Sequence, residues 1–243
     1  MKVNTMLNVS KALLDDLVSA NHILVNEGVF DGFGHVSVRH ESRPDRFLIS
    51  RSLPPSMVQA QDILECDLEG QVHDAQDRKS YLERFIHSAV YKARPDVVAV
   101  IHSHSPAIIP FGVTGARLRP ICHMSGFLGS VTPVFEIRDA VGESSDMLIR
   151  NQALGESLAA TLGQSAVALM RGHGSVTVGK SLPQAVFRAI YTEANARLQA
   201  QSMMLGEVTY LSDDEAFNSS EVNDQQIERP WQLWKQKIKA AER

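Results

Sequence analysis

The chain has 243 residues and 44% of them are hydrophobic, so it can bury a sizeable core, and we expect a single domain over residues 1–243. The formal net charge of -4 is small and residues of both signs are interspersed, which argues against a nucleic-acid partner or a polybasic membrane anchor. The two cysteines lack the spacing of a zinc knuckle or a disulfide framework, and no apolar run approaches the roughly 20 residues that span a bilayer. We therefore expect a soluble cytoplasmic protein whose partner is a small molecule, with no nucleic acid and no membrane.

Apolar residues recur at helical spacing in several segments, and continuous or alternating apolar runs between them indicate strands. The predicted helices span residues 8–29, 80–93, 107–111, 151–162, 181–207 and 229–243. The predicted strands span residues 35–39, 46–50, 97–101, 131–138 and 166–170, with a further hairpin over 63–72. The acidic segment 213–224 is expected to be a loop, so that 213–243 is a C-terminal loop and tail helix. In that tail, Trp231 and Trp234 are expected to dock onto the body or onto a neighbouring subunit.

A buried strand over residues 97–101 leads into His102 and His104. Because the side-chain period of a strand is two residues, the two imidazoles point to the same face and can share one metal ion. Hydrogen-bonded structural histidines are the alternative. A catalytic metal site needs three protein ligands and an open position. His173, which lies between two glycines after a second buried run, is the candidate third ligand, and a purely structural turn histidine is its alternative.

Other polar residues near these strands have competing interpretations. The pattern Ser-x-x-Glu at residues 80–83 has the form of a capping box, and on this local pattern alone Glu83 is a helix cap. His87, one turn later, is expected to pack or to support the site rather than to bind metal. His35 opens the first strand of a hairpin and Arg51 follows the second, so both could face one cleft. A solvated histidine and a surface arginine are the alternative.

Four motifs in order along the chain resemble the class II aldolase/adducin family. They are Gly-x-Val-Ser-Val-Arg, a helix opening with Glu-x-x-x-His, Arg-Pro-Asp before a strand that ends in His-Ser-His-Ser, and a later Gly-His-Gly. The resemblance covers about residues 9–205. It implies an α/β fold of three α/β/α layers with a mixed, largely antiparallel central sheet. It also implies a homotetramer with active sites at the subunit interfaces.

Carried over residue by residue, the resemblance assigns a metal site. His102, His104 and His173 match the family's three metal-ligating histidines, and Glu83 matches the acidic residue beside the metal. One divalent metal ion per subunit is therefore implied, zinc or manganese, with iron also possible. The resemblance replaces the cap-only interpretation of Glu83 with a role as ligand or base. A glutamate at a helix N-terminus can serve both purposes because the helix dipole favours its ionised form.

Departures from the family's sugar-phosphate aldolases indicate a different substrate. His35 replaces an asparagine, and His123 stands where a tyrosine of the neighbouring subunit protonates the leaving aldehyde. Tyr81 and Leu82 replace two serines that hold the substrate phosphate, and Arg51 lies in place of a Thr-Gly loop. A guanidinium suits a carboxylate, which it holds with two parallel hydrogen bonds, and apolar side chains suit a ring.

These substitutions resemble the branch of the family that decarboxylates hydroxylated aromatic or heteroaromatic acids. The resulting hypothesis is a lyase of aromatic compound catabolism, a metal-dependent decarboxylase of an aromatic (di)carboxylic acid. In it Glu83 or His123 delivers a proton, and Arg51 with His35 orients a carboxylate. The candidate site residues are Glu83, His123 and His35 for catalysis, and Arg51, Ser50 and Tyr81 for substrate binding.

Two alternatives stay open on the sequence. A class II aldolase that cleaves a hydroxy-keto acid or a sugar phosphate needs the same metal-stabilised enolate. A non-enzymatic module like the adducin head keeps the fold without the metal, and the presence of all three histidines and the glutamate argues against it.

Overall fold

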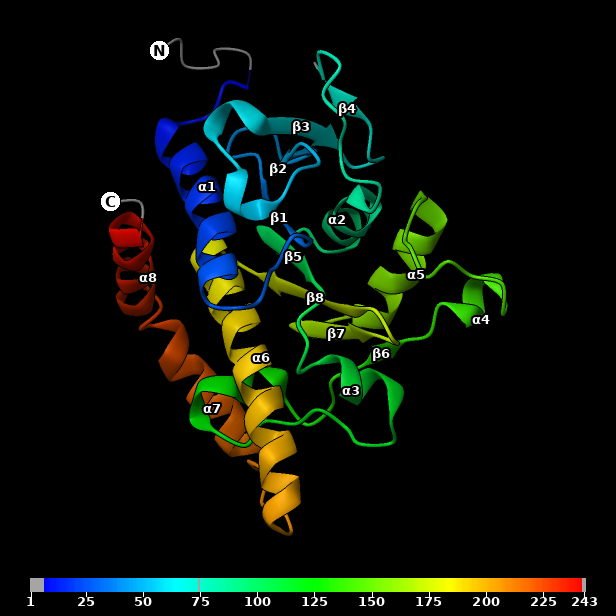
Figure 1. Cartoon of the computed structure of the whole chain (residues 1–243), viewed down its shortest axis with the longest axis vertical. Helices are drawn as coiled ribbons and strands as arrows, with labels where there is room; N and C mark the ends of the chain where they lie inside the picture. The colour runs from blue at the N-terminus through cyan, green and yellow to red at the C-terminus, as the bar shows by residue number, and fades with distance from the viewer. Residues whose placement is uncertain (1–6, 74, 242–243) are drawn as a thin grey trace.

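One mixed sheet of eight strands forms the centre of the molecule, in the computed structural model that describes residues 7–73 and 75–241. In chain order the strands are β1 (His35–Arg39), β2 (Arg46–Ser50), β3 (Ile63–Asp67), β4 (Val72–His73), β5 (Ala99–Ser103), β6 (Val134–Phe135), β7 (Val167–Met170) and β8 (Gly174–Gly179). Their spatial order is β4-β3-β2-β1-β5-β8-β7-β6 (Figure 1). Neighbouring strands pair antiparallel except β6 and β7, which are parallel. The expected mixed, largely antiparallel sheet is confirmed.

Helices cover both faces of this sheet, which gives the three expected layers (Figure 1). One face carries α1 (Lys11–Asn26), α6 (Leu182–Leu205) and α8 (Glu228–Ala241), and the other carries α2 (Arg84–Ala93) and α5 (Gln152–Leu162). Successive side chains of β5 point to opposite faces of the sheet, which explains why there are two cores. Ala99 and Ile101 belong to the core under α1, α6 and α8, and Val100 belongs to the core under α2 and α5. The other described helices are η1 (Pro55–Met57), η2 (Ala60–Asp62), α3 (Ile109–Val113), η3 (His123–Leu128), α4 (Arg138–Val141) and α7 (Asp213–Asp224).

The segment expected to be an acidic loop is the helix α7, so that prediction is wrong. Ser212 caps it, because its side chain accepts from the N–H of Glu215 while the Glu215 carboxylate accepts from the N–H of Ser212. The acidic residues of its first turn also suit the positive end of the helix dipole. Few of its side chains are buried, so the sequence of this segment lacks the apolar stripe that would predict a helix.

Two further local expectations are corrected. Only Val134–Phe135 of the predicted strand 131–138 pairs with β7, since the ring of Pro133 removes a donor and Arg138 already begins α4. The capping box at residues 80–83 is absent. Glu83 is the N-cap residue of α2, but its side chain makes no cap hydrogen bond and turns instead toward the histidines.

The C-terminal tail docks onto the body of the same chain. Trp231 and Trp234 are buried in the core that α1 and α6 share. Residues 242–243 of the predicted tail helix and residues 1–6 of the predicted domain lie outside the described residues. Among the described helices, none has the length and apolar character needed to cross a membrane.

Candidate functional site

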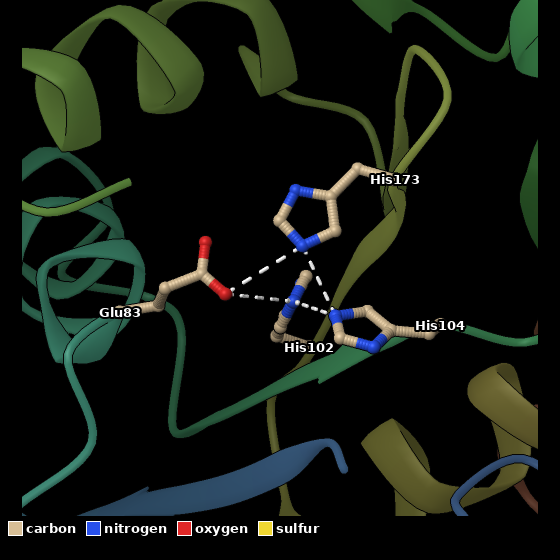
Figure 2. A group of neighbouring side chains, drawn as sticks. All are labelled: Glu83, His102, His104 and His173. Atoms are coloured by element: carbon tan, nitrogen blue, oxygen red, sulfur yellow. Dashed lines mark hydrogen bonds and ion pairs between the residues drawn. The ribbon is translucent and has the colours of Figure 1, made fainter. Parts of the chain in front are cut away.

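Four side chains from three parts of the chain converge at the end of β5 (Figure 2). His102 lies on β5, His104 follows it, His173 lies in the turn between β7 and β8, and Glu83 directly precedes α2. Nε2 of His104 lies 3.1 Å from Nε2 of His102 and 3.0 Å from Nε2 of His173. Oε2 of Glu83 lies 3.6 Å from Nε2 of His102 and 3.5 Å from Nε2 of His173. The structure thus brings together the three histidines and the glutamate singled out in the sequence.

Two glycines allow His173 to reach this position. Gly172 has a φ of +63°, a left-handed conformation that turns the chain between the two strands. A Cβ on Gly174 would lie 1.9 Å from the carbonyl oxygen of Ser103, so only glycine lets β8 approach β5 this closely. The Gly-His-Gly sequence therefore presses His173 against the strand that carries His102.

His102 and His173, as neutral rings, each turn an unprotonated nitrogen toward the centre of the cluster. Nδ1 of His102 donates to the carbonyl oxygen of Ser175 at 3.1 Å, and Nδ1 of His173 donates to that of Met147 at 2.9 Å. A neutral imidazole carries one N–H, so Nε2 of both rings is left as a lone pair. Burial lowers the pKa of His102 to about 3 and also lowers the pKa of His104, which favours the neutral rings that bind metals.

The four converging atoms fit one divalent ion. Zinc lies about 2.0–2.1 Å from a histidine nitrogen, so its ligand atoms are about 3.3 Å apart at tetrahedral corners and about 2.9 Å apart at adjacent octahedral corners. Four of the six separations are 3.0 to 3.6 Å and agree with these values, and all four atoms lie within 4.8 Å of one another. Lone pairs and a carboxylate that converge in this way repel one another unless a cation lies between them. A backbone carbonyl on the second nitrogen is also the usual partner of a metal-binding histidine.

Glu83 is held as a carboxylate. Burial alone would raise its pKa, but the adjacent imidazoles of His173 and His102 and the N–H of Ile149 lower the pKa to about 2. Oε1 accepts from the N–H of Ile149 at 2.9 Å, which leaves Oε2 to face the histidines. Figure 2 shows this carboxylate pointing from the start of α2 toward the three rings. The group can therefore act as a ligand or as a base.

A cavity of about 620 Å³ opens beside the cluster, and Glu83, His102 and His104 are part of its lining. The rest of the wall is largely apolar or aromatic and includes Phe33, Leu53, Pro54, Tyr81, Leu82 and Leu148. No lysine or arginine is among the described residues that line it. A phosphate carries about 1.5 to 2 negative charges at neutral pH and is usually held by cationic side chains. The wall suits a flat apolar ring better than a phosphate.

Three of the remaining candidates lie at or directly behind this wall. His35 and Tyr81 line the cavity with their ring centroids 4.6 Å apart, and the His35 ring also packs on His102 at 5.0 Å. Ser50 is fully buried, and its Oγ lies 3.1 Å from the Oη of Tyr81, which in turn donates to the carbonyl oxygen of Leu53. Ser50 therefore fixes the ring of Tyr81 rather than facing the cavity.

Arg51 and His123 are outside the cavity lining within this chain. Nε of Arg51 donates to Oδ1 of Asp62 at 2.7 Å, and the Arg51 side chain is 40% exposed. His123 belongs to η3, where its carbonyl oxygen accepts from Nδ2 of Asn223 on α7. A contribution of His123 to a cavity would therefore come from another copy of the chain.

The sequence reasoning missed the cavity residues Phe33, Leu53, Pro54 and Leu148. They lie in loops with no hydrophobic period to mark them. It also missed that His87 reaches His35, with 2.6 Å between Nε2 of His87 and Nδ1 of His35. The helical spacing of His87 from Glu83 was the one available signal, and it indicated a supporting residue without naming its partner.

Comparisons with known proteins agree with this geometry. Residues 15–200 match the family described as the Class II Aldolase and Adducin N-terminal domain. Decarboxylase tropJ of Talaromyces stipitatus is 38% identical over 91% of this chain and 92% of its own length. The 3,4-dihydroxyphthalate decarboxylase of Arthrobacter keyseri is 28% identical over 77% of each chain. The solved L-fuculose 1-phosphate aldolase of Glaciozyma antarctica superposes with a TM-score of 0.78 at 24% identity, over 96% of this chain and 90% of that one, which shows a shared fold.

Proposed function

Because this chain belongs to the class II aldolase and adducin family, we propose that it is a metal-dependent decarboxylase of a hydroxylated aromatic or heteroaromatic carboxylic acid. The chain is a lyase, since its relatives tropJ and 3,4-dihydroxyphthalate decarboxylase are decarboxylases, which break a carbon–carbon bond. The observation that carries the finer proposal is the cavity, in which the histidine and glutamate cluster meets an apolar wall with no lysine or arginine in the described lining.

We propose His102, His104 and His173 as ligands of one zinc or manganese ion, with Glu83 beside them. The chemistry that such an ion supplies is Lewis-acid stabilisation of negative charge on a substrate oxygen. Tyr81 and Leu82 would contact the faces of the ring and exclude water from it. The terminal guanidinium nitrogens of Arg51 have no hydrogen-bond partner among the described residues, so they are free to bind a second carboxylate.

The reaction needs one proton delivered to the ring carbon that carries the departing carboxylate. This step gives a β-keto-acid-like tautomer, and the bond to the carboxylate then breaks, carbon dioxide leaves, and the electron pair returns to the ring. Glu83 is ionised in the structure, so it delivers a proton only after it has taken one from the substrate or from water. His123 of a neighbouring subunit is the second candidate donor.

Carbon dioxide release tests the proposal. Purified protein reconstituted with zinc or manganese is offered ortho-hydroxylated benzene and pyridine carboxylates, with sugar phosphates and hydroxy-keto acids assayed in parallel for aldehyde release. We expect metal-dependent carbon dioxide and no aldehyde, and the His173→Ala variant controls for free metal in the buffer. Aldehyde from a sugar phosphate would replace the decarboxylase with an aldolase.

We further propose that the chain forms a homotetramer whose active sites lie between subunits. The support is that His123 is not part of the cavity lining of its own chain. Mixing two inactive variants, Glu83→Ala and His123→Phe, would then restore activity, because mixed oligomers contain sites with both residues intact. Loss of His123 should lower kcat by about 10²–10³ if it acts on the transition state. No recovery in mixed oligomers that are verified by mass would overturn the active site shared between subunits.

A further inference from the structure

A line of four buried polar side chains leads from the cavity into the core between β1 and α2. Nδ1 of His35 lies 2.6 Å from Nε2 of His87, whose Nδ1 lies 2.6 Å from Oγ of Ser37. Oγ of Ser37 lies 2.8 Å from Oη of Tyr91, and Tyr91 donates to the carbonyl oxygen of Val98 at 3.3 Å. All four side chains belong to residues that are at most 4% exposed. The proposed mechanism does not use His87, Ser37 or Tyr91.

Each imidazole in this line carries a single proton. Burial lowers the pKa of His87 to about 3. The His35 ring is 4% exposed and bonds to no carboxylate among the described residues, so a charge on it would be buried without a counter-charge. Both rings are therefore neutral near pH 7, with one nitrogen as a donor and the other as an acceptor. Which nitrogen carries the proton follows from the other end of the line.

The carbonyl oxygen of Val98 sets the direction, because it can only accept. Tyr91 donates its single proton there, so Ser37 must donate to Tyr91 and His87 must donate through Nδ1 to Ser37. Nε2 of His87 is then an acceptor, and His35 must donate to it through Nδ1. The reverse order would leave Oη of Tyr91 and the Val98 oxygen facing each other as two acceptors.

This direction leaves Nε2 of His35 as a lone pair on the side of the cavity. His35 lines the cavity, and its Nε2 has no hydrogen-bond partner among the described residues. A bare nitrogen of this kind repels a carboxylate and attracts an O–H. The substrate group that suits it is a hydroxyl on the ring.

We infer that Tyr91, Ser37 and His87 are positioning residues that hold His35 as its Nδ1–H tautomer, so that Nε2 accepts a hydrogen bond from the ring hydroxyl of the substrate. The inference rests on the proposed function for the identity of that hydroxyl. It changes the role of His35 from the carboxylate contact expected in the sequence to a hydroxyl contact. The line of hydrogen bonds is thereby a device for selecting hydroxylated rings.

The tautomer can be measured without turnover. Long-range ¹H–¹⁵N correlation spectra of ¹⁵N-labelled, zinc-loaded protein distinguish the protonated from the bare ring nitrogen, and the His35→Gln variant assigns the signals. We expect the proton of His35 on Nδ1. The Tyr91→Phe variant removes the donor to Val98 and frees Ser37 to donate to His87, so the Nε2–H tautomer of His35 should appear. A proton on Nε2 in the unaltered protein, or no response to Tyr91→Phe, overturns the inference.

Ligand selection is measured with salicylate and 2-methoxybenzoate, which share the carboxylate but differ in the hydroxyl proton. Calorimetry on zinc-loaded protein should give a preference for salicylate that falls about fivefold in Ser37→Ala and Tyr91→Phe, the value of one ordinary hydrogen bond. The matched control is Ser88→Ala, another fully buried serine, whose Oγ bonds to Gln152 outside the line. It should leave the preference unchanged.

The two experiments separate the inference from the function on which it rests. An Nδ1–H tautomer with no binding of salicylate supports the line of hydrogen bonds and counts against the proposed substrate class. An Nδ1–H tautomer with a salicylate preference that is the same in Ser37→Ala as in Ser88→Ala overturns the selection of hydroxylated rings.

Discussion

Glu193 of α6 is a buried carboxylate that fixes the loop directly after His104. Its Oε2 accepts from Oγ of Ser105 and from the N–H of Ala107, the latter at 3.1 Å. Its Oε1 accepts from Nη2 of Arg197 at 3.3 Å. Glu193 is 5% exposed, whereas the Arg197 side chain is 60% exposed, so the loop and not the arginine is its main partner.

Replacing Glu193 by alanine should destabilise the protein and weaken the metal site together. A hydrogen bond to a charged group contributes about 1.5–3 kcal/mol, so losing the two bonds to the loop should lower the free energy of unfolding by about 3–6 kcal/mol. Urea unfolding of metal-free protein measures this change. Relaxation of the loop should also misplace His104 and reduce zinc affinity about tenfold, measured by competition with a chelator.

Two variants control this experiment. Arg197→Ala removes an exposed ion pair and should cost less than about 1 kcal/mol, with no change in zinc affinity. Glu193→Gln keeps one acceptor beside the loop and should lie between the alanine variant and the unaltered protein. If zinc affinity is unchanged in Glu193→Ala while stability falls as expected, the loop does not position His104 and the reasoning is refuted.

Three further outcomes follow from the site. Zinc at 100 times its Kd should raise the free energy of unfolding by about 2.7 kcal/mol and Tm by about 5–11 °C, as measured by calorimetry, and His173→Ala should abolish this shift. Burial lowers the pKa of His87 to about 3, so below its ordinary 6.5 only the unfolded chain takes up that proton. The free energy of unfolding of metal-free protein should therefore fall from pH 6.5 toward 3, and less steeply in His87→Gln, with buried His102 supplying part of the remaining slope. Arg51→Lys should raise KM for a dicarboxylate about tenfold with little change in kcat, and an equal effect on a monocarboxylate would show that Arg51 binds no second carboxylate.

The convergence of the histidines could be anticipated because it depends on local rules. The two-residue period of β5 places His102 and His104 on one side, and Gly172 and Gly174 mark a turn where the backbone passes close to a neighbouring strand. Both rules depend only on residues that are adjacent in the sequence. The sheet itself could be anticipated for the same reason, from its apolar runs.

Glu83 and α7 show where local rules fail. The Ser-x-x-Glu pattern predicts that Glu83 caps the helix. In the structure its carboxylate instead contacts Ile149 and His173, which are distant in the sequence. In α7 the capping box is present at Ser212, but the apolar stripe typical of a helix is absent, so the sequence pattern predicts a loop there. The contact of His35 with His87 joins residues 52 positions apart through the packing of a helix on a sheet, and no sequence period encodes it.

The backbone of the loop before α5 makes hydrogen bonds to two of the candidate ligands. The carbonyl oxygen of Met147 accepts from Nδ1 of His173, and the N–H of Ile149 donates to Oε1 of Glu83. These two contacts decide which nitrogen of His173 and which oxygen of Glu83 face the centre. Met147 has a φ of +69°, a left-handed conformation that costs a non-glycine residue free energy and that the surrounding contacts must offset. Because one strained turn orients candidate ligands that lie 90 residues apart in the chain, the proposed metal site depends on this loop as much as on the strands that carry the histidines.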